Sequence, residues 1–202
     1  LWPGVLEAFR LIGSEQIQGR ASLGGNLCNG SPAGDSVPAL IAAGCKAVIA
    51  GPKGRKDVPI ENFHLGPGKT VLENGEMLVS LKFPKRVSNS ADAYLRMTPR
   101  TEMDIAVVGC GVNISLENDI CTHARVSLGA VAPTPLLIEE ASDIMIGSKL
   151  DDDTLDKVSK ICMDACNPIN DKRGTVDYRT KVAGVLAKRA TKLAAERIGG
   201  NK

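Results

Sequence analysis

Apolar residues recur at helical spacing at the start of the chain and through its last third. Val5, Ala8 and Ile12 share one face of an opening segment, and Gly44 follows another short apolar run as a C-terminal stop. The spacing predicts helices over residues 1–12, 37–43, 138–145, 153–166 and 176–198. Helices therefore open and close the chain.

Between these helices, the apolar positions follow the short runs and the two-residue period of strands. Strands are predicted over residues 46–50, 58–60, 77–83, 91–97, 105–116 and 120–131. The last three form an antiparallel meander, in which 117–119 is the turn between the final two strands. Strands followed by a run of helices are typical of the α+β class.

A change of character near residue 88 predicts two domains. Residues 1–87 are expected to form a mixed α/β unit, and residues 88–202 a three-stranded antiparallel sheet with a helical bundle. A chain of 202 residues is long enough to bury a substantial core in one or two domains.

Charge and composition narrow the classes of function. Twenty-five basic and 23 acidic side chains leave a net charge of only +2, which does not favour a nucleic-acid partner. No apolar run approaches the ~20 residues of a membrane span, and no signal-peptide pattern opens the chain. We therefore expect a cytoplasmic protein.

The six cysteines do not have the spacing of a metal site. Four are scattered singly, and Cys162 and Cys166 are one helical turn apart with no second ligand pair. We expect buried or semi-buried free thiols in a reducing compartment, and no metal. The acidic run 151–153 suits a helix N-terminus better than a calcium loop.

No catalytic constellation of side chains is present. The chain has two histidines and lacks a nucleophile elbow or a paired metal motif. His64 is expected to be a surface or structural residue, because no carboxylate or nucleophile accompanies it in a recognisable motif. We therefore expect no catalytic side chain.

The stretch 20–35 has the composition of a backbone loop that wraps an anion. Gly24 and Gly25 carry no Cβ, so another group can come close to their peptide N–H groups. Ser22 and Asn26 add hydrogen-bond donors, and Asp35 stands before an apolar run as a helix N-cap. An ordinary tight turn uses the same residue types, and composition alone leaves both interpretations open.

The order of the motifs resembles the FAD-binding medium subunits of molybdenum hydroxylases, which include carbon monoxide dehydrogenase and the FAD domain of xanthine dehydrogenase. The resemblance covers nearly the whole chain. It rests on IQGRASLGGN at 17–26, SPAGD at 31–35, GPKGR at 51–55, GEMLV at 75–79, MDIAVV at 103–108, LGAVAPTP at 128–135 and DYR at 177–179.

The resemblance implies FAD as the cofactor and assigns roles to seven residues. Four would hold the pyrophosphate, namely Ser22, Gly24, Gly25 and Asn26. Asp35 would lie at the ribose or cap the following helix, and Leu78 and Arg96 would flank the flavin. The family more often has lysine at the position of Arg96. From the pattern alone, Leu78 is equally a core leucine and Arg96 equally a solvated strand residue.

The resemblance also implies a function and partners. Substrate would be oxidised in a molybdenum-containing large subunit, and electrons would pass through an iron–sulfur small subunit to FAD and then to an acceptor. A first FAD-binding subdomain would precede Leu1, so we expect a fragment that is inactive alone.

Two alternatives remain open. In the first, the chain is a folded interaction module that no longer binds FAD and pairs with another chain or with a second copy as a homodimer. Another flavoprotein of the same broad fold, such as a cell-wall precursor reductase, fits SPAGD and LGAVAPTP less well.

Overall fold

A four-stranded antiparallel sheet forms the centre of the chain in the computed structural model, which describes residues 2–101 and 103–199. Its strands lie in the order β6-β7-β8-β9. They are β6 (Ser90–Met97), β7 (Val108–Glu117), β8 (Ile120–Gly129) and β9 (Leu136–Leu137). Asn118 and Asp119 close the β7–β8 hairpin with positive φ angles of 50° and 64°, which Asn and Asp tolerate better than most residues.

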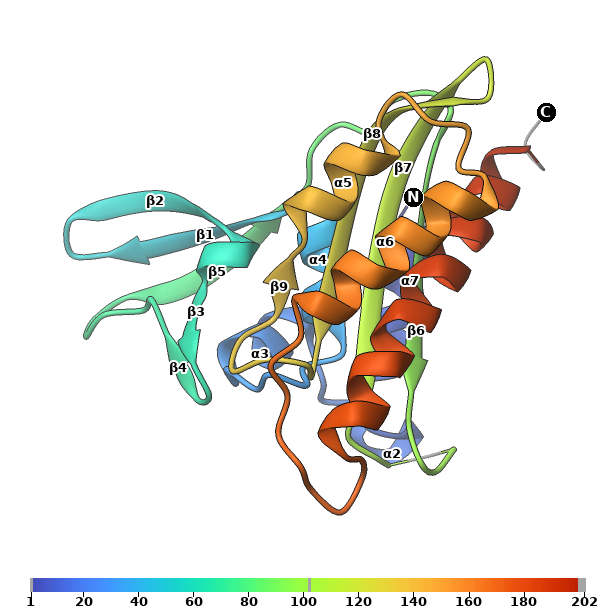
Figure 1. Cartoon of the computed structure of the whole chain (residues 1–202). Coiled ribbons are helices and arrows are strands. Elements are labelled where there is room, and N and C mark those ends of the chain that lie inside the picture. The colour runs from blue at the N-terminus through green and yellow to red at the C-terminus, as the bar shows by residue number, and fades with distance from the viewer. Residues whose placement is uncertain (1, 102, 200–202) are drawn as a thin grey trace.

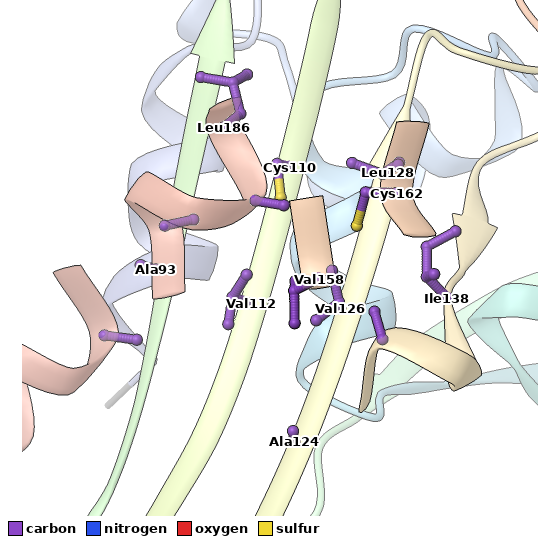
Figure 2. Packing of buried hydrophobic residues seen from close by; sticks show 14 of the residues in the cluster. Ala93, Cys110, Val112, Ala124, Val126, Leu128, Ile138, Val158, Cys162 and Leu186 are labelled. Atoms are coloured by element: carbon purple, nitrogen blue, oxygen red, sulfur yellow. The ribbon is translucent and has the colours of Figure 1, made fainter. Parts of the chain in front are cut away.

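Three helices cover one face of this sheet (Figure 1). They are α5 (Glu139–Met145), α6 (Asp152–Asp164) and α7 (Val176–Gly199). Figure 2 shows Cys110, Val112 and Leu128 from the strands beside Val158 and Cys162 from α6 and Leu186 from α7, all of which are buried. Burying one such aliphatic side chain contributes about 1.5–3 kcal/mol. The buried cluster between the sheet and these three helices has more members than the second buried cluster of the chain, so it contributes more to stability.

Helices α1 (Pro3–Arg10) and α4 (Ser36–Ala42) pack on the opposite face. Every residue of α4 is buried. At Gly111 of β7, an added Cβ would lie 2.5 Å from the carbonyl oxygen of Pro38, and at Gly129 of β8 it would lie 2.6 Å from Pro38 Cγ. Glycine at these two positions therefore lets α4 approach the sheet backbone.

A smaller sheet projects away from the central one (Figure 1). It has the order β2-β1-β5 and consists of β1 (Lys46–Gly51), β2 (Gly54–Pro59) and β5 (Met77–Lys82), all paired antiparallel. A 3₁₀ turn (Ile60–Asn62) and the hairpin of β3 (His64–Gly66) and β4 (Lys69–Thr70) link β2 to β5. Two short helices, α2 (Glu15–Gln18) and α3 (Leu23–Cys28), lie between α1 and α4.

The α+β class is confirmed, and most predicted elements are present within a few residues of their expected bounds. The predicted meander forms β6, β7 and β8, and short β9 extends that sheet to four strands. Residues 105–107 were expected to begin a strand, but β7 starts at Val108. The stretch 20–35 was expected to be a loop, and this is wrong in part because α3 lies within it.

Candidate functional site

A groove of about 410 Å³ separates the start of α3 from β5. Its walls are residues 21–24 on one side, residues 78–81 on the other and Phe9 of α1 at one end. Ser22, Gly24 and Leu78, which are far apart in sequence, therefore line one hollow. These are three of the seven residues that the sequence assigned to cofactor binding.

Ser22 is the N-cap of α3. Its Oγ accepts a hydrogen bond from the Gly25 N–H at 2.9 Å, which is the usual way to satisfy one of the free donors of a first helical turn. Within residues 2–101 and 103–199, no acceptor is recorded for the N–H groups of Leu23 and Gly24. The anion-wrapping loop expected from the sequence is thus a helical turn with two donors still unpaired.

The glycine pair keeps the groove open at this turn. A Cβ added to Gly24 would touch Leu78 Cδ2 at 3.4 Å, so any larger side chain would fill the space between α3 and β5. A Cβ added to Gly25 would lie 3.1 Å from Ser22 Oγ and crowd the cap. Gly24 is therefore a position at which the absence of a side chain maintains a cavity.

Asn26 has a structural role that the sequence did not assign to it. Its Oδ1 accepts hydrogen bonds from the Ser36 N–H at 3.1 Å and the Ser36 hydroxyl at 2.8 Å. Asn26 thereby caps α4 from a distance. Asp35 stands at the predicted N-cap position of α4, but the capping role expected of its side chain is wrong, because that side chain makes no capping hydrogen bond and Asn26 Oδ1 accepts from the Ser36 N–H instead.

Asp35 instead forms a buried ion pair with Arg96 of β6. Asp35 Oδ1 lies 3.1 Å from Arg96 Nη1, and the two side chains are only 12% and 8% exposed. Arg96 Nη1 also donates to the Leu11 carbonyl at 3.0 Å. Burial raises the pKa of Asp35, and the charge and hydrogen bond of Arg96 oppose that rise without cancelling it. Arg96 is therefore a buried residue, not the solvated strand residue that was one interpretation.

Tyr94 lies two residues before Arg96 on the same face of β6. Burial raises its pKa well above the ordinary value, and the Asp35 carboxylate adds to that rise. Its hydroxyl has no hydrogen-bond partner in the described part of the chain. Asp35, Arg96 and Tyr94 form a polar cluster between α4 and β6 that lies outside the residues lining the groove.

Two buried polar residues outside the groove were given no binding role by the sequence. His64 is buried, with Nε2 lying 2.7 Å from the Leu27 carbonyl, which agrees with a structural role and excludes the surface interpretation. Arg179 of α7 donates to the Val107 carbonyl at 2.7 Å and to Asp171 Oδ1 at 2.8 Å. The only available signal for Arg179 was its place in the DYR motif.

Among the described residues, no group of three His, Cys, Asp or Glu side chains is close enough together to hold a metal ion. All six thiols are free, as expected, but Cys28 is exposed where a buried or semi-buried residue was predicted. In residues 2–101 and 103–199, no helix combines the length and apolar character that crossing a membrane requires.

Comparison with known proteins identifies similar families for both parts of the chain. Residues 2–86 match the model of the FAD binding domain in molybdopterin dehydrogenase, and residues 93–194 match the CO dehydrogenase flavoprotein C-terminal domain. The carbon monoxide dehydrogenase medium chain of Hydrogenophaga pseudoflava is 32% identical over 192 residues, covering 95% of this chain and 67% of that one. The xanthine dehydrogenase FAD-binding subunit of Escherichia coli O157:H7 is 31% identical over 199 residues, covering 98% and 68%.

Solved structures agree with these matches. A carbon monoxide dehydrogenase of Hydrogenophaga pseudoflava that lacks the Mo-pyranopterin moiety superimposes with a TM-score of 0.93 at 33% identity, covering 96% of this chain and 68% of that chain. The reconstituted CO dehydrogenase of Oligotropha carboxidovorans gives a TM-score of 0.89 at 32% identity, covering 93% and 65%. The chain thus spans about two thirds of the length of these relatives.

Proposed function

The chain belongs to the family of FAD-binding medium subunits of molybdenum hydroxylases, and we propose that it holds FAD in the groove between α3 and β5 and relays electrons through it. Electrons would arrive from iron–sulfur clusters in a small subunit, after substrate oxidation in a large molybdenum-containing subunit. FAD supplies the redox chemistry when bound, so the protein needs only to grip and orient it. This agrees with the lack of a catalytic side-chain set.

The observation that carries the proposal is the gap at Gly24. Its missing Cβ leaves room against Leu78, and the unpaired N–H groups of Leu23 and Gly24 are donors suited to a diphosphate. Ser22 and Gly25 form the cap that holds this turn, and Asn26 fixes the turn to α4. The residues therefore fit a diphosphate-containing cofactor at the open side of α3.

The three remaining residues, Asp35, Leu78 and Arg96, would contact FAD in two different ways in this proposal. Leu78 would contact the cofactor directly across the groove. The Asp35–Arg96 pair would bind the ribose or the flavin only after these side chains rearrange. At present Arg96 Nη1 donates hydrogen bonds to both Asp35 Oδ1 and the Leu11 carbonyl. The positive charge of Arg96 would favour a reduced, anionic flavin where it comes near the ring.

Exposed apolar side chains lie on and beside the walls of the groove, which supports a role for a further segment. Met77 and Val79 on β5 are 64% and 42% exposed, and Phe9 at the end of the groove is partly exposed. Apolar side chains beside a cofactor groove are normally covered. We propose that the third of the relatives' length that this chain does not span covers these apolar side chains and closes the groove, so the chain alone binds FAD weakly and is inactive.

The two matched regions also support a division of the chain into two domains with different roles. Residues 1–87 would be the second half of the FAD-binding domain, and residues 88–202 the C-terminal domain of the flavoprotein. In this division the groove belongs to the first part, whereas Arg96 is contributed by the second.

An FAD titration followed by flavin fluorescence tests this proposal. The purified chain is titrated alone and together with the segment of the Hydrogenophaga pseudoflava medium chain that it does not span. We expect weak quenching alone and strong, saturable quenching with the added segment. Absence of quenching in both mixtures would favour the alternative, a folded interaction module that pairs with another chain or with itself and no longer binds FAD.

Two glycine variants locate the cofactor. Gly24→Ala adds a methyl group at ordinary contact distance from Leu78, so it preserves the fold while intruding into the groove. Gly19→Ala is the matched control, because nothing lies within 4 Å of an added Cβ there. We expect FAD affinity about tenfold lower in Gly24→Ala only. Equal affinity in both variants would place FAD elsewhere.

A further inference from the structure

Strand β6 is an edge strand of the central sheet, so one row of its backbone groups faces away from β7. In an antiparallel strand, the N–H and C=O groups of one residue point to the same side, and that side alternates along the strand. Asp92 and Tyr94 belong to the outward row, because side chains from other segments bind their backbone groups. Ser90 belongs to it as well, since its carbonyl accepts a hydrogen bond from Arg86 Nη2 at 2.8 Å.

Glu7 and Arg197 together occupy the middle of this outward row. Glu7 Oε2 accepts a hydrogen bond from the Tyr94 N–H at 3.1 Å, and Arg197 Nη1 donates to the Asp92 carbonyl. Glu7 and Arg197 also form an ion pair with each other. Glu7 lies on α1 and Arg197 on α7, which pack on opposite faces of the sheet. The pair therefore bridges the two faces across the edge of β6, and we call it the edge latch.

Helix α1 lies directly against the strand that the edge latch crosses. A Cβ added at Gly4 would lie 2.8 Å from the backbone carbonyl carbon of Ala93, so glycine is what allows this approach. Asp92 and Tyr94 are each only 3% exposed. A further strand therefore cannot reach the outward row of β6 while α1 is in place. Covering an edge with another element is one way in which proteins prevent unwanted strand pairing.

Polar contacts hold much of α1 in this position. The helix has eight residues, of which only Gly4, Val5 and Ala8 are buried, whereas every residue of α4 is buried. A helix of this length is not stable in isolation, so its position depends on tertiary contacts. Its polar contacts with β6 are the edge latch, the bond from the Val5 N–H to Asp92 Oδ2 and the bond from Arg96 to the Leu11 carbonyl. Loss of the edge latch would therefore loosen the cover.

The uncovered row would be complementary to the same row of a second copy. Two β6 strands related by a two-fold axis at Ala93 place Tyr94 of one copy opposite Asp92 of the other. The Tyr94 N–H would then donate to the Asp92 carbonyl, so the two groups that the edge latch now occupies would satisfy each other. The aspartates of the two copies do not lie directly opposite one another, which avoids a like-charge pair.

We propose that α1 is a latched cover over a strand-pairing surface on β6, and that release of the edge latch lets β6 pair with β6 of a second copy of this chain. The Glu7 carboxylate and its ion pair with Arg197 keep this edge closed. The inference is independent of the proposed FAD function, because Glu7 and Arg197 are not among the residues that line the groove between α3 and β5.

Amide hydrogen exchange and analytical ultracentrifugation of the purified chain test this proposal without FAD. Glu7→Ala removes both the acceptor for the Tyr94 N–H and the ion pair, and Arg197→Met removes the ion pair and the donor to Asp92. In dilute Glu7→Ala, we expect the Tyr94 amide to exchange at least about tenfold faster, because its acceptor is lost and α1 opens more often. Both variants should dimerise with a dissociation constant at least about tenfold below that of the unchanged chain.

Two further variants separate release of the edge latch from a general loss of stability. Lys192→Ala is the matched control, since Lys192 is also a cation of α7 but pairs with Asp152 of α6 at 2.8 Å. It should match the unchanged chain in both measurements. Glu7→Gln loses the charge that binds Arg197 but keeps an acceptor oxygen for the Tyr94 N–H. It should show smaller changes of the same sign, and it tests the proposal if urea unfolding shows that Glu7→Ala does not fold.

Raising the concentration of Glu7→Ala locates the interface. The Tyr94 amide should become protected again as dimers form, because the Asp92 carbonyl of the second copy replaces Glu7 as its acceptor. Folded variants that stay monomeric, or that keep slow exchange at Tyr94, would overturn the proposal. Dimers in which the Tyr94 amide still exchanges rapidly would place the interface elsewhere, and equal dimerisation of Lys192→Ala would make it a general effect of a lost charge on α7. Either result overturns the proposal as well.

Discussion

Replacing Asp35 with leucine removes one partner of a buried ion pair and leaves the Arg96 guanidinium without its carboxylate. The two side chains are almost fully buried, so water cannot replace the lost charge. Removing one partner of such a pair typically costs about 3–5 kcal/mol. We expect Asp35→Leu to lower the free energy of unfolding by that amount, and Arg96→Met to have a similar effect.

The double variant should recover most of this loss. Burial raises the pKa of Asp35 despite Arg96, which means that their attraction does not fully offset the desolvation of the carboxylate. Replacing a whole buried pair by apolar residues is often neutral or stabilising. Because Arg96 also binds the Leu11 carbonyl, Asp35→Leu/Arg96→Met should still cost about 1 kcal/mol for that unpaired acceptor.

Urea unfolding followed by circular dichroism measures all four proteins of this cycle. With single costs of about 3–5 kcal/mol each and a double cost of about 1 kcal/mol, the coupling free energy between the two sites should be about 5–9 kcal/mol, with unchanged denaturant dependence. A coupling near zero, with each single variant costing under about 1 kcal/mol, would refute the buried pair. A double variant that loses the sum of the two single costs would refute it equally.

The pH dependence of stability gives an independent check on Asp35. Its folded pKa is raised above the ordinary value of 3.8, so the folded state binds this proton more readily than the unfolded state. The resulting stabilisation is fully present below pH 3.8 and is lost as the pH rises through the folded pKa. The stability of the unchanged chain minus that of the double variant should therefore fall over this window. A rise would mean that Arg96 outweighs burial.

Two further predictions concern packing and thiol reactivity. Gly111→Ala should destabilise the chain by about 1–3 kcal/mol in urea unfolding, because the added Cβ would meet the Pro38 backbone, whereas Gly19→Ala should have little effect. An equal cost for both would contradict the close packing of α4 on β7. Ellman's reagent should modify one thiol rapidly, and Cys28→Ser should abolish that phase, since Cys28 is the exposed cysteine of the six. Four of the other thiols are buried and Cys166 is half-buried, and burial raises the pKa of Cys45 to about 12 and that of Cys166 to about 11, so a second rapid phase would contradict this shielding.

The helices and strands were largely predictable because buried side chains recur along each of them with the period that is characteristic of a helix or of a strand. Strand β7 and the helices that cover it show this clearly, since Val112 and Ile114 face the helices while Asn113 faces away. Helix α3 was not predictable in the same way. Two glycines and an asparagine disfavour a helix, and the turn forms because Ser22 caps it and Leu27 is fully buried beneath it.

The site was predictable in part, for similar reasons. The glycine pair and its serine identified the turn that faces the groove, and resemblance supplied Leu78 across it. The pairing of Asp35 with Arg96 joins residues 61 positions apart and leaves no local signal in the sequence. Position alone made Asp35 an apparent cap, but Asn26, ten residues before Ser36, had the better geometry for that task.

The first and last helices of the chain are joined by an ion pair between Glu7 and Arg197, residues 190 positions apart. Arg197 also donates to the Asp92 carbonyl on β6, and α1 carries Phe9 at the end of the groove. During synthesis, α1 leaves the ribosome before α7 and cannot complete these contacts until α7 has emerged. The helix that carries Phe9 therefore becomes anchored only after more than 180 further residues have been added, so the groove between α3 and β5 reaches its final shape late relative to the synthesis of its own lining residues.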